Sequence, residues 1–514
     1  MLFSSYIFIF AFLPIMLLGF YGLRYFNQNF LAKLFLVLGS LFFYAFWEIK
    51  YLGLLLLSIL INYRITSLML KNFAKNNRGG GHNKFYLYIG IFFNLALLGF
   101  FKYTDFFLEN FNLFSKLLHL DFNIPLPHIL LPLAISFFTF QQIAFLVDCY
   151  KRIDIKDLEE NYDSIFSSHF KIDFLDYCLF VSFFPQLIAG PIVHHKEMMP
   201  QFKSLSNSVQ WDKIAKGVFI FSMGLFKKVF IADSFAKWAN NGFSIVEKGG
   251  FLNIAESWAT SLSYTFQLYF DFSGYCDMAI GLGLLFGILL PINFNSPYKS
   301  LSITEFWRKW HITLGRFLKE YLYIPLGGNR GSKLLTLRNL FLVAFLSGVW
   351  HGAGFGFIIW GALHGLAMCL HRAYGYILES LNLHKATFLQ SRLYKVLCWI
   401  LTFNFLNMTW VFFRAENLQG AFNLLAGMFG IVWVELPEKA RHIPKLLANL
   451  DGRNETLFFL IFAFIIVLCV KNSIELLHNF KPSWKNVIFV SVLFYVAIVT
   501  LSITPYVEFI YFNF

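Results

Sequence analysis

Two adjoining stretches decide the fold expected for this chain: WRKWHITLGRFLKEYLYIPLGGNRGS at 307–332 and NLFLVAFLSGVWHGAGFGFIIWGALHG at 339–365. The first is amphipathic and carries His311. The second is apolar enough to lie in lipid, yet it carries His351 and His364. Because ionisable side chains at membrane depth are costly, these histidines indicate a functional site.

The first stretch predicts a helix that lies in the cytoplasmic interface of the membrane. Trp307, Trp310 and His311 follow helical spacing and share one face, and the basic residues lie largely on the other. Two interpretations of His311 stay open at this point. The imidazole either faces lipid headgroups or points into the same cavity as His351.

The composition predicts an all-α polytopic membrane protein. Of the 514 residues, 58% are hydrophobic and 14% are charged, whereas about a quarter of the residues of soluble domains are charged. The net charge of +13 is typical of basic cytoplasmic loops and not of nucleic-acid binding. We expect one integral membrane domain over 1–514, with its motifs at 130–371 and an aromatic tail at 506–514.

Apolar segments that approach the length of a bilayer span recur along the whole chain. Some of the shorter ones are expected to be re-entrant or interfacial, so we predict about ten to twelve crossings. The candidate spans are 2–22, 33–47, 51–70, 85–108, 130–148, 174–192, 214–233, 257–275, 278–294, 339–371, 393–413, 457–470 and 487–505.

The orientation follows from the lysines and arginines of the short loops. Loops 71–84, 297–338 and 372–395 are rich in these residues and are predicted to be cytoplasmic. Segment 414–456 has balanced charge, and the last nine residues carry no basic residue. Both are predicted to lie outside, and three spans precede the first basic loop. The N- and C-termini are therefore expected in the periplasm.

The stretch between two of these cytoplasmic loops predicts a hairpin. Segment 339–371 would be about 50 Å long as one helix, which is too long for one crossing and would end on the wrong side. Gly352, Gly354 and Gly356 lie near its middle. Two half-length helices with a turn at 352–356 solve both problems and place His351 at the turn. Irregular backbone at that depth needs protein or water around it, so we expect a cavity there.

The histidines suit acid–base chemistry, because a neutral imidazole has a pKa near physiological pH. His351 is either a general base or a core histidine bonded to a carbonyl, and the flanking Trp350 and the glycines favour the first. His364 is predicted to be structural. The histidine spacing does not match a zinc motif, so no metal is expected.

A second polar cluster lies in the apolar segment 263–283. Buried carboxylates need partners, so these groups either orient an imidazole or a loop, or clamp two helices together. The residues are Gln267, Tyr269, Asp271, Ser273 and Asp277.

Six blocks between 130 and 370 resemble the membrane-bound O-acyltransferase (MBOAT) family. The resemblance is strongest to its bacterial branch of alginate O-acetylation proteins, peptidoglycan O-acetyltransferases and the D-alanyl transfer protein DltB. The blocks are FFTFQQIAFLVDCYKR (137–152), FFPQLIAGPIVHHKEMMPQF (183–202), YFDFSGYCDMAIGLG (269–283), PINFNSPYKSLSITEFWRKWHITL (291–314), YLYIPLGGNRGS (321–332) and GVWHGAGFGFIIWGALHG (348–365).

The resemblance implies a ring of helices around a thinned centre with a cytoplasmic funnel. It also implies that His351 is catalytic, with His311 as the second histidine. Trp307, Trp310, Trp350 and the polar cluster at 263–283 would support the substrate. The implied setting is the bacterial inner membrane.

The implied reaction is transfer of an acyl group, expected to be acetyl, from a cytoplasmic thioester to an extracytoplasmic polysaccharide. The expected donor is acetyl-CoA or another acyl-CoA or acyl-carrier thioester, with no tightly bound cofactor. Peptidoglycan is the first choice of acceptor and alginate or another exopolysaccharide the second. A periplasmic SGNH or esterase-like transferase is the expected partner. A flippase of a lipid-linked precursor and a non-catalytic scaffold remain as other classes.

The tail Phe509-Ile510-Tyr511-Phe512-Asn513-Phe514 admits two interpretations. It is either an aromatic anchor at the outer interface or an acyl carrier. The second follows from a resemblance of F-x-Y-x-x-F to the end of the small DltX peptide that works with DltB. Tyr511 would then hold the acyl group transiently.

Overall fold

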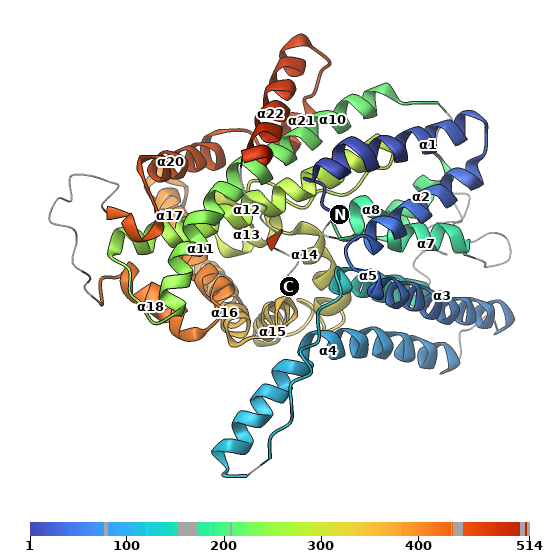
Figure 1. Cartoon of the computed structure of the whole chain (residues 1–514). Coiled ribbons are helices and arrows are strands. Elements are labelled where there is room, and N and C mark those ends of the chain that lie inside the picture. Colours follow the sequence, from blue (N-terminus) through green and yellow to red (C-terminus); the bar gives the residue numbers. More distant parts are fainter. Residues whose placement is uncertain are drawn as a thin grey trace. The chain divides into compact units, whose positions relative to one another are not determined.

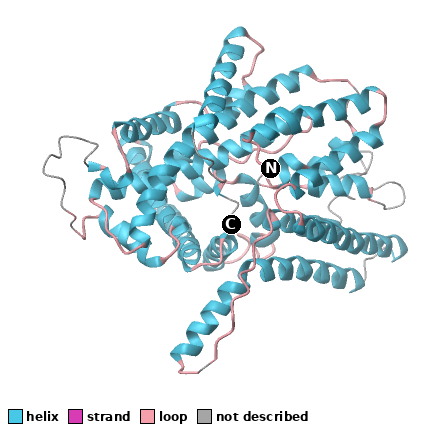
Figure 2. Cartoon of the chain, in the orientation of Figure 1, coloured by secondary structure: helices cyan, strands magenta, loops and turns pink. Residues whose placement is uncertain are grey.

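Every regular element among the described residues is a helix (Figure 2). Large apolar side chains such as Leu18, Leu401 and Ile503 are more than 70% exposed, as expected where lipid surrounds the helices. The predicted all-α membrane fold is confirmed. The structure is a computed structural model, which describes residues 1–76, 81–120, 122–151, 172–188, 190–205, 208–383, 385–432, 434, 446–503 and 509–510.

Six helices in these ranges are long and apolar enough to cross a membrane, and two shorter helices are also apolar. The long ones are Phe8–Tyr25, Lys50–Phe73, His82–Leu117, Lys333–His351, Arg392–Arg414 and Trp484–Ile503. The shorter ones are Asn29–Ala45 and Asn454–Cys469. The protein is therefore a multi-pass membrane protein, and the figure of about ten to twelve crossings stays a prediction.

The chain forms two compact units, of which the first comprises residues 1–221 and 275–291. Within it α1 packs on α2, α3 on α4 and α4 on α5. Its elements are η1 (Phe8–Phe12), α1 (Leu13–Tyr25), α2 (Asn29–Ala45), α3 (Lys50–Asn76), α4 (Gly81–Leu117), α5 (Ile135–Lys151), α7 (Phe174–Ser182), α8 (Phe184–Leu187) and α9 (His195–Lys203).

The second unit comprises residues 222–274 and 292–512 and holds all three histidines discussed above. Helices α10 (Trp211–Phe226) and α12 (Ile254–Leu285) contribute to both units. The other elements of the second unit are η2 (Lys227–Ala232), α11 (Asp233–Glu247), η3 (Pro297–Lys299), α13 (Ile303–Lys309), α14 (Ile312–Leu318), η4 (Lys319–Tyr323), α15 (Lys333–His351), α16 (Phe355–Ser380), η5 (Thr387–Gln390), α17 (Arg392–Arg414), α18 (Leu418–Met428), η6 (Ala448–Leu450), α20 (Asn454–Cys469), α21 (Ser473–His478) and α22 (Trp484–Ile503).

The predicted hairpin is present, with α15 and α16 packed side by side (Figure 1). The turn is shorter than expected and consists of residues 352–354. A β-carbon on Gly352 would lie 2.1 Å from the Phe357 ring, so any larger residue at this position would have to displace that ring.

The prediction of half-length helices was wrong. α15 has 19 residues and α16 has 26, which gives about 28 Å and 39 Å at 1.5 Å per residue. Both helices continue into the basic flanks that were predicted to be loops. Ser332 caps the first one, because its hydroxyl accepts the backbone N–H of Leu335 at 3.3 Å.

The predicted spans 257–275 and 278–294 are one helix, α12, as far as Leu285. Its glycines do not break it but let other backbones approach. A β-carbon on Gly274 would lie 2.8 Å from the carbonyl oxygen of Gly224. The predicted span 174–192 is instead broken at Phe183, whose backbone (φ −51°, ψ 110°) is not helical and separates α7 from α8. Pro185 near the start of that helix favours a new helix over continuation of α7.

Candidate active site

His351 is the last residue of α15 and is 2% exposed. Its Nδ1 lies 2.6 Å from the carbonyl oxygen of Ser347. A carbonyl can only accept a hydrogen bond, so Nδ1 carries the hydrogen. Nε2 then holds the lone pair, which is the tautomer that a general base needs.

Aromatic rings surround this imidazole. Trp350, Trp360 and Phe413 have ring centroids 4.8, 5.0 and 5.2 Å from that of His351. These three rings form a wall around His351, and the cavity predicted beside this residue stays a prediction. Such a wall excludes water and strengthens electrostatic interactions at the imidazole.

The predicted continuous helix through His311 is interrupted at that residue. α13 ends at Lys309, Trp310 is extended, and His311 lies in the left-handed region with φ 46° before α14 begins. Left-handed backbone is strained for a residue with a β-carbon and is common at functional sites. The prediction missed this break because the strain is offset by contacts from a distant segment.

Those contacts come from Asn293, which lies 18 residues before His311. Its Oδ1 accepts the N–H and hydroxyl of Thr313 at 3.2 and 3.0 Å and lies 3.2 Å from His311 Nδ1. The Thr313 N–H can only donate, so the Asn293 atom that it contacts is the amide oxygen. An amide oxygen can only accept a hydrogen bond, so Nδ1 of His311 carries the hydrogen. The N–H of Ile312 also donates to the carbonyl of Asn293 at 3.0 Å. His311 therefore has the same tautomer as His351.

A stack of tryptophans connects the two histidines. Trp310 lies 5.2 Å from Trp410, Trp410 lies 5.6 Å from Trp360, and Trp360 lies 5.0 Å from His351. His311 itself follows Trp310 in the chain. The two imidazoles are also close enough to interact electrostatically. The interpretation in which His311 faces headgroups is wrong, because its side chain is fully buried.

His364 has both ring nitrogens occupied. Its Nδ1 accepts the indole N–H of Trp307 at 3.2 Å, and its Nε2 lies 3.1 Å from the hydroxyl of Thr409. That hydroxyl in turn donates to the carbonyl of Leu406 at 3.0 Å. The ring that accepts at Nδ1 must donate at Nε2, so this histidine clamps α13 to α17. The arrangement fits the predicted structural role.

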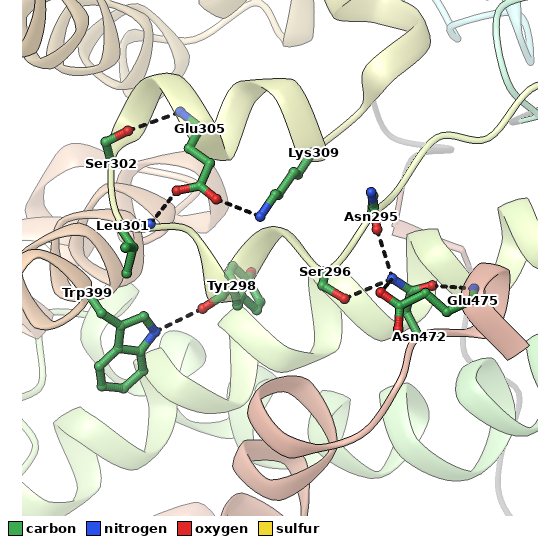
Figure 3. A network of polar contacts seen from close by, with 10 residues as sticks. All are labelled: Asn295, Ser296, Tyr298, Leu301, Ser302, Glu305, Lys309, Trp399, Asn472 and Glu475. Carbon is green, nitrogen blue, oxygen red and sulfur yellow. Dashed lines mark hydrogen bonds and ion pairs between the residues drawn. The ribbon is translucent and has the colours of Figure 1, made fainter. Parts of the chain in front are cut away.

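The segment that leads into His311 is held by a polar network on α13 (Figure 3). Glu305 accepts the backbone N–H of Leu301 at 2.8 Å and pairs with Lys309 at 2.6 Å, and Ser302 caps the N–H of Glu305 at 3.2 Å. Burial raises the pKa of the Glu305 carboxyl, but these hydrogen bonds outweigh burial and hold the pKa below its usual value. The carboxylate is therefore charged at neutral pH and fixes the start of α13.

Trp399 of α17 and Asn472, the N-cap residue of α21, complete this network (Figure 3). Trp399 of α17 donates its indole N–H to the carbonyl of Tyr298 at 2.9 Å. The amide of Asn472 donates to Asn295 Oδ1 and to Ser296 Oγ, each at 2.9 Å. These bonds fix the polypeptide between Asn293 and α13, and so the geometry of His311.

The polar cluster of α12 is buried, but its residues make different contacts. Tyr269 packs on Trp310 with ring centroids 6.3 Å apart, so it adjoins the tryptophan stack. Asp271 forms an ion pair with Lys228 of η2 at 2.9 Å. Gln267 Oε1 and Ser273 Oγ have no hydrogen-bond partner among the described residues. Asp277 is buried in the first unit.

The tail approaches this site through its described residues. Ile510 donates its backbone N–H to Asp271 Oδ2 at 2.9 Å. Phe509 is fully buried, with its ring centroid 6.1 Å from that of Phe272, and Phe272 lies 4.9 Å from His311. Tyr511 lies outside the described residues.

Sequence reasoning missed several members of the site. Asn293 lies inside the quoted block 291–314 and is flanked by apolar and proline positions, which was the available signal. Trp360, Trp410 and Phe413 were indistinguishable from ordinary apolar helix residues. Their role depends on α16 and α17 packing together.

The model of the membrane-bound O-acyltransferase family matches residues 117–413. That range covers more than half of the chain and includes α15, α16 and both candidate catalytic histidines. The chain belongs to the membrane-bound O-acyltransferase family. The resemblance of the six sequence blocks is confirmed.

Three relatives show which branch of the family this MBOAT protein is similar to. It is 48% identical to the peptidoglycan O-acetyltransferase of Helicobacter pylori, over all of this chain and 98% of the relative. It is 40% identical to the "Probable alginate O-acetylase AlgI" of Pseudomonas aeruginosa, over 88% and 78% of the two chains. It is 26% identical to the teichoic acid D-alanyltransferase of Bacillus subtilis, over 54% and 68%.

Proposed function

We propose that this MBOAT protein transfers an acetyl group from a cytoplasmic thioester to peptidoglycan outside the bacterial inner membrane. The observation that carries the proposal is the hydrogen bond between His351 Nδ1 and the Ser347 carbonyl, which leaves Nε2 as the basic nitrogen. The match to a peptidoglycan O-acetyltransferase over the whole chain supports the choice of polymer.

His351 acts as the general base in this proposal. Its Nε2 takes the proton of an acceptor hydroxyl while the hydroxyl oxygen attacks the thioester carbonyl. The carbon–sulfur bond then breaks, and the thiolate takes the proton from the imidazolium and leaves as the free thiol. His311 supports His351 or polarises the carbonyl. Trp307, Trp310, Trp350 and the α12 residues Gln267, Tyr269, Asp271, Ser273 and Asp277 support the substrate.

Acetyl-CoA is the proposed donor. It is polyanionic, and the basic residues of the cytoplasmic loops 297–338 and 372–395 would attract it. If these basic loops are cytoplasmic, as their charge indicates, both termini lie in the periplasm.

Tyr511 is the proposed first acceptor. A phenol activated by an imidazole forms an aryl ester, which stays reactive toward a second hydroxyl. The placement of Phe509 and Ile510 beside Phe272 and Asp271 supports this role, because Phe272 also contacts His311. A periplasmic esterase-like partner would then take the acetyl group and release the phenol.

Alginate or another exopolysaccharide is the second candidate acceptor. The 40% identity to the Pseudomonas aeruginosa protein supports it, although that match covers less of both chains. The polymer that loses O-acetyl groups when the gene is deleted distinguishes the two acceptors.

Turnover of the thioester tests the reaction class. Purified protein is incubated with [¹⁴C]acetyl-CoA, and free thiol release and label on the protein are measured. An acyltransferase is expected to release thiol and to lose that activity with His351→Gln. A flippase or a scaffold would leave the thioester intact, and that result would contradict the proposal.

A further inference from the structure

The second unit buries a lysine between two carboxylates. Lys228 Nζ lies 2.6 Å from Asp233 Oδ1 and 2.9 Å from Asp271 Oδ1. The side chains of Lys228, Asp233 and Asp271 are 2%, 10% and 1% exposed. Two buried carboxyl groups share one ammonium group, so their remaining oxygens are costly to bury without further hydrogen bonds.

The C-terminal segment supplies such a bond from 239 residues away. The backbone N–H of Ile510 donates to Asp271 Oδ2 at 2.9 Å. Asp271 therefore bridges Lys228 through one carboxylate oxygen and the segment's backbone through the other. A hydrogen bond to a charged carboxylate is stronger than one between neutral groups.

Phe272, the residue after Asp271 on α12, contacts the same segment through its aromatic ring. Phe509 is fully buried, and its ring centroid is 6.1 Å from that of Phe272. Phe272 also lies against His311 at 4.9 Å. Two consecutive α12 residues thus hold the backbone and a side chain of the tail next to a candidate catalytic histidine.

We infer that Asp271 and Phe272 form a binding site for an aromatic, uncharged peptide segment, here the protein's own C-terminus. Lys228 and Asp233 are positioning residues, because Lys228 pairs with the Asp271 carboxylate and Asp233 pairs with Lys228. The consequence for acetyl transfer rests on the proposed role of Tyr511, which follows Ile510 directly.

The test uses the purified full-length protein with Phe509→Cys as a reporter, which keeps the backbone of the tail and the Ile510 N–H. The background carries serine at Cys369, Cys398 and Cys469, which are the cysteines that are not buried. The rate of maleimide labelling at position 509 reports release of the tail, because Phe509 is fully buried, and O-acetylation in cells reports function. Thermal unfolding of each variant shows that it is folded.

Asp271→Leu removes the acceptor, and Asp271→Asn keeps a neutral one. We expect the first to raise the labelling rate at least about tenfold and the second to raise it less, in line with the strength of a charged hydrogen bond. Asp233→Asn is the matched control, since it removes a buried charge from Lys228 and leaves the tail's partner in place. It should raise labelling less than Asp271→Leu.

Ile510→Pro covers the case in which Asp271→Leu does not fold. Proline deletes the donor N–H and leaves the buried charges untouched, and Ile510→Val is its control. Unchanged labelling with Ile510→Pro would overturn the binding site. Raised labelling with full O-acetylation would uphold the binding site and contradict the acyl-carrier role of Tyr511, so the two ideas fail separately.

Discussion

Gly348 of α15 and Gly361 of α16 lie so close that a β-carbon on Gly348 would stand 2.6 Å from the α-carbon of Gly361. The same atom would stand 2.5 Å from the carbonyl oxygen of Phe357. The hairpin therefore closes on a glycine-to-glycine contact, three residues before His351. Such close backbone approach is typical of helices that pack in membranes.

Gly348→Ala is expected to destabilise the hairpin, because backbone atoms of α16 have no room to yield. Overpacking of this kind typically costs about 1–3 kcal/mol. Gly375→Ala on α16 is the control, since a β-carbon there meets nothing within 4 Å and alanine favours a helix. Thermal unfolding in detergent should show a lower midpoint for the first variant and an equal or higher one for the second. Equal midpoints for Gly348→Ala and the wild type would contradict the close contact.

Asn293→Ala should lower acetyl transfer by at least about tenfold, because His311 loses the group that fixes its tautomer and its strained backbone. Thr313→Val removes only one donor to Asn293 and should have a smaller effect. Initial rates of thioester turnover measure both. If the two variants have the same rate, Asn293 does not act through His311.

Thr409→Val should affect stability and not chemistry. It leaves the Nε2–H of His364 without its acceptor at a buried site, which costs about 1–3 kcal/mol. Thr409→Ser keeps the hydroxyl and should behave as the wild type. The turnover per folded molecule should stay within about twofold in both variants. A selective loss of turnover in Thr409→Val would contradict the structural role of His364 and indicate that it takes part in the reaction.

The orientation can be tested by labelling introduced cysteines in intact cells. Lys385→Cys lies in the predicted cytoplasmic loop 372–395, and Glu455→Cys lies in segment 414–456, predicted to be outside. Both positions are exposed. A membrane-impermeant maleimide should label position 455 in intact cells and position 385 only after lysis. The reverse pattern would invert the topology and remove the cytoplasmic route for the donor.

The hairpin could be predicted from sequence because loop charge and segment length depend on local composition. Two basic loops on one side require an even number of crossings between them, and the glycines after His351 mark the turn. The family could also be predicted, since its motifs are contiguous blocks of sequence. The continuity of α12 could not be predicted from sequence, because whether a glycine breaks a helix depends on which backbone packs against it.

The residues that surround the histidines could not be predicted from the sequence either. The break at His311 depends on Asn293 and Asn295, which pair with residues 309–313 only in the folded chain. Two of the rings around His351, those of Trp360 and Phe413, come from α16 and α17, whose apolar residues look alike in sequence. The contact between Ile510 and Asp271 joins positions that no local pattern relates. In each case the deciding partner is distant along the chain.

The decisive measurement is the amount of O-acetyl groups on the peptidoglycan of cells that produce wild-type protein, His351→Gln or no protein. Glutamine fills a similar space but has no titratable nitrogen, and a general base contributes about 10²–10⁴-fold to a rate. Mass spectrometry of muropeptides should show O-acetylation with the wild type. Cells with His351→Gln should match cells without the gene, although the variant is inserted at normal levels. Wild-type O-acetylation with His351→Gln would contradict the role of His351, and unchanged O-acetylation without the gene would contradict peptidoglycan as the acceptor.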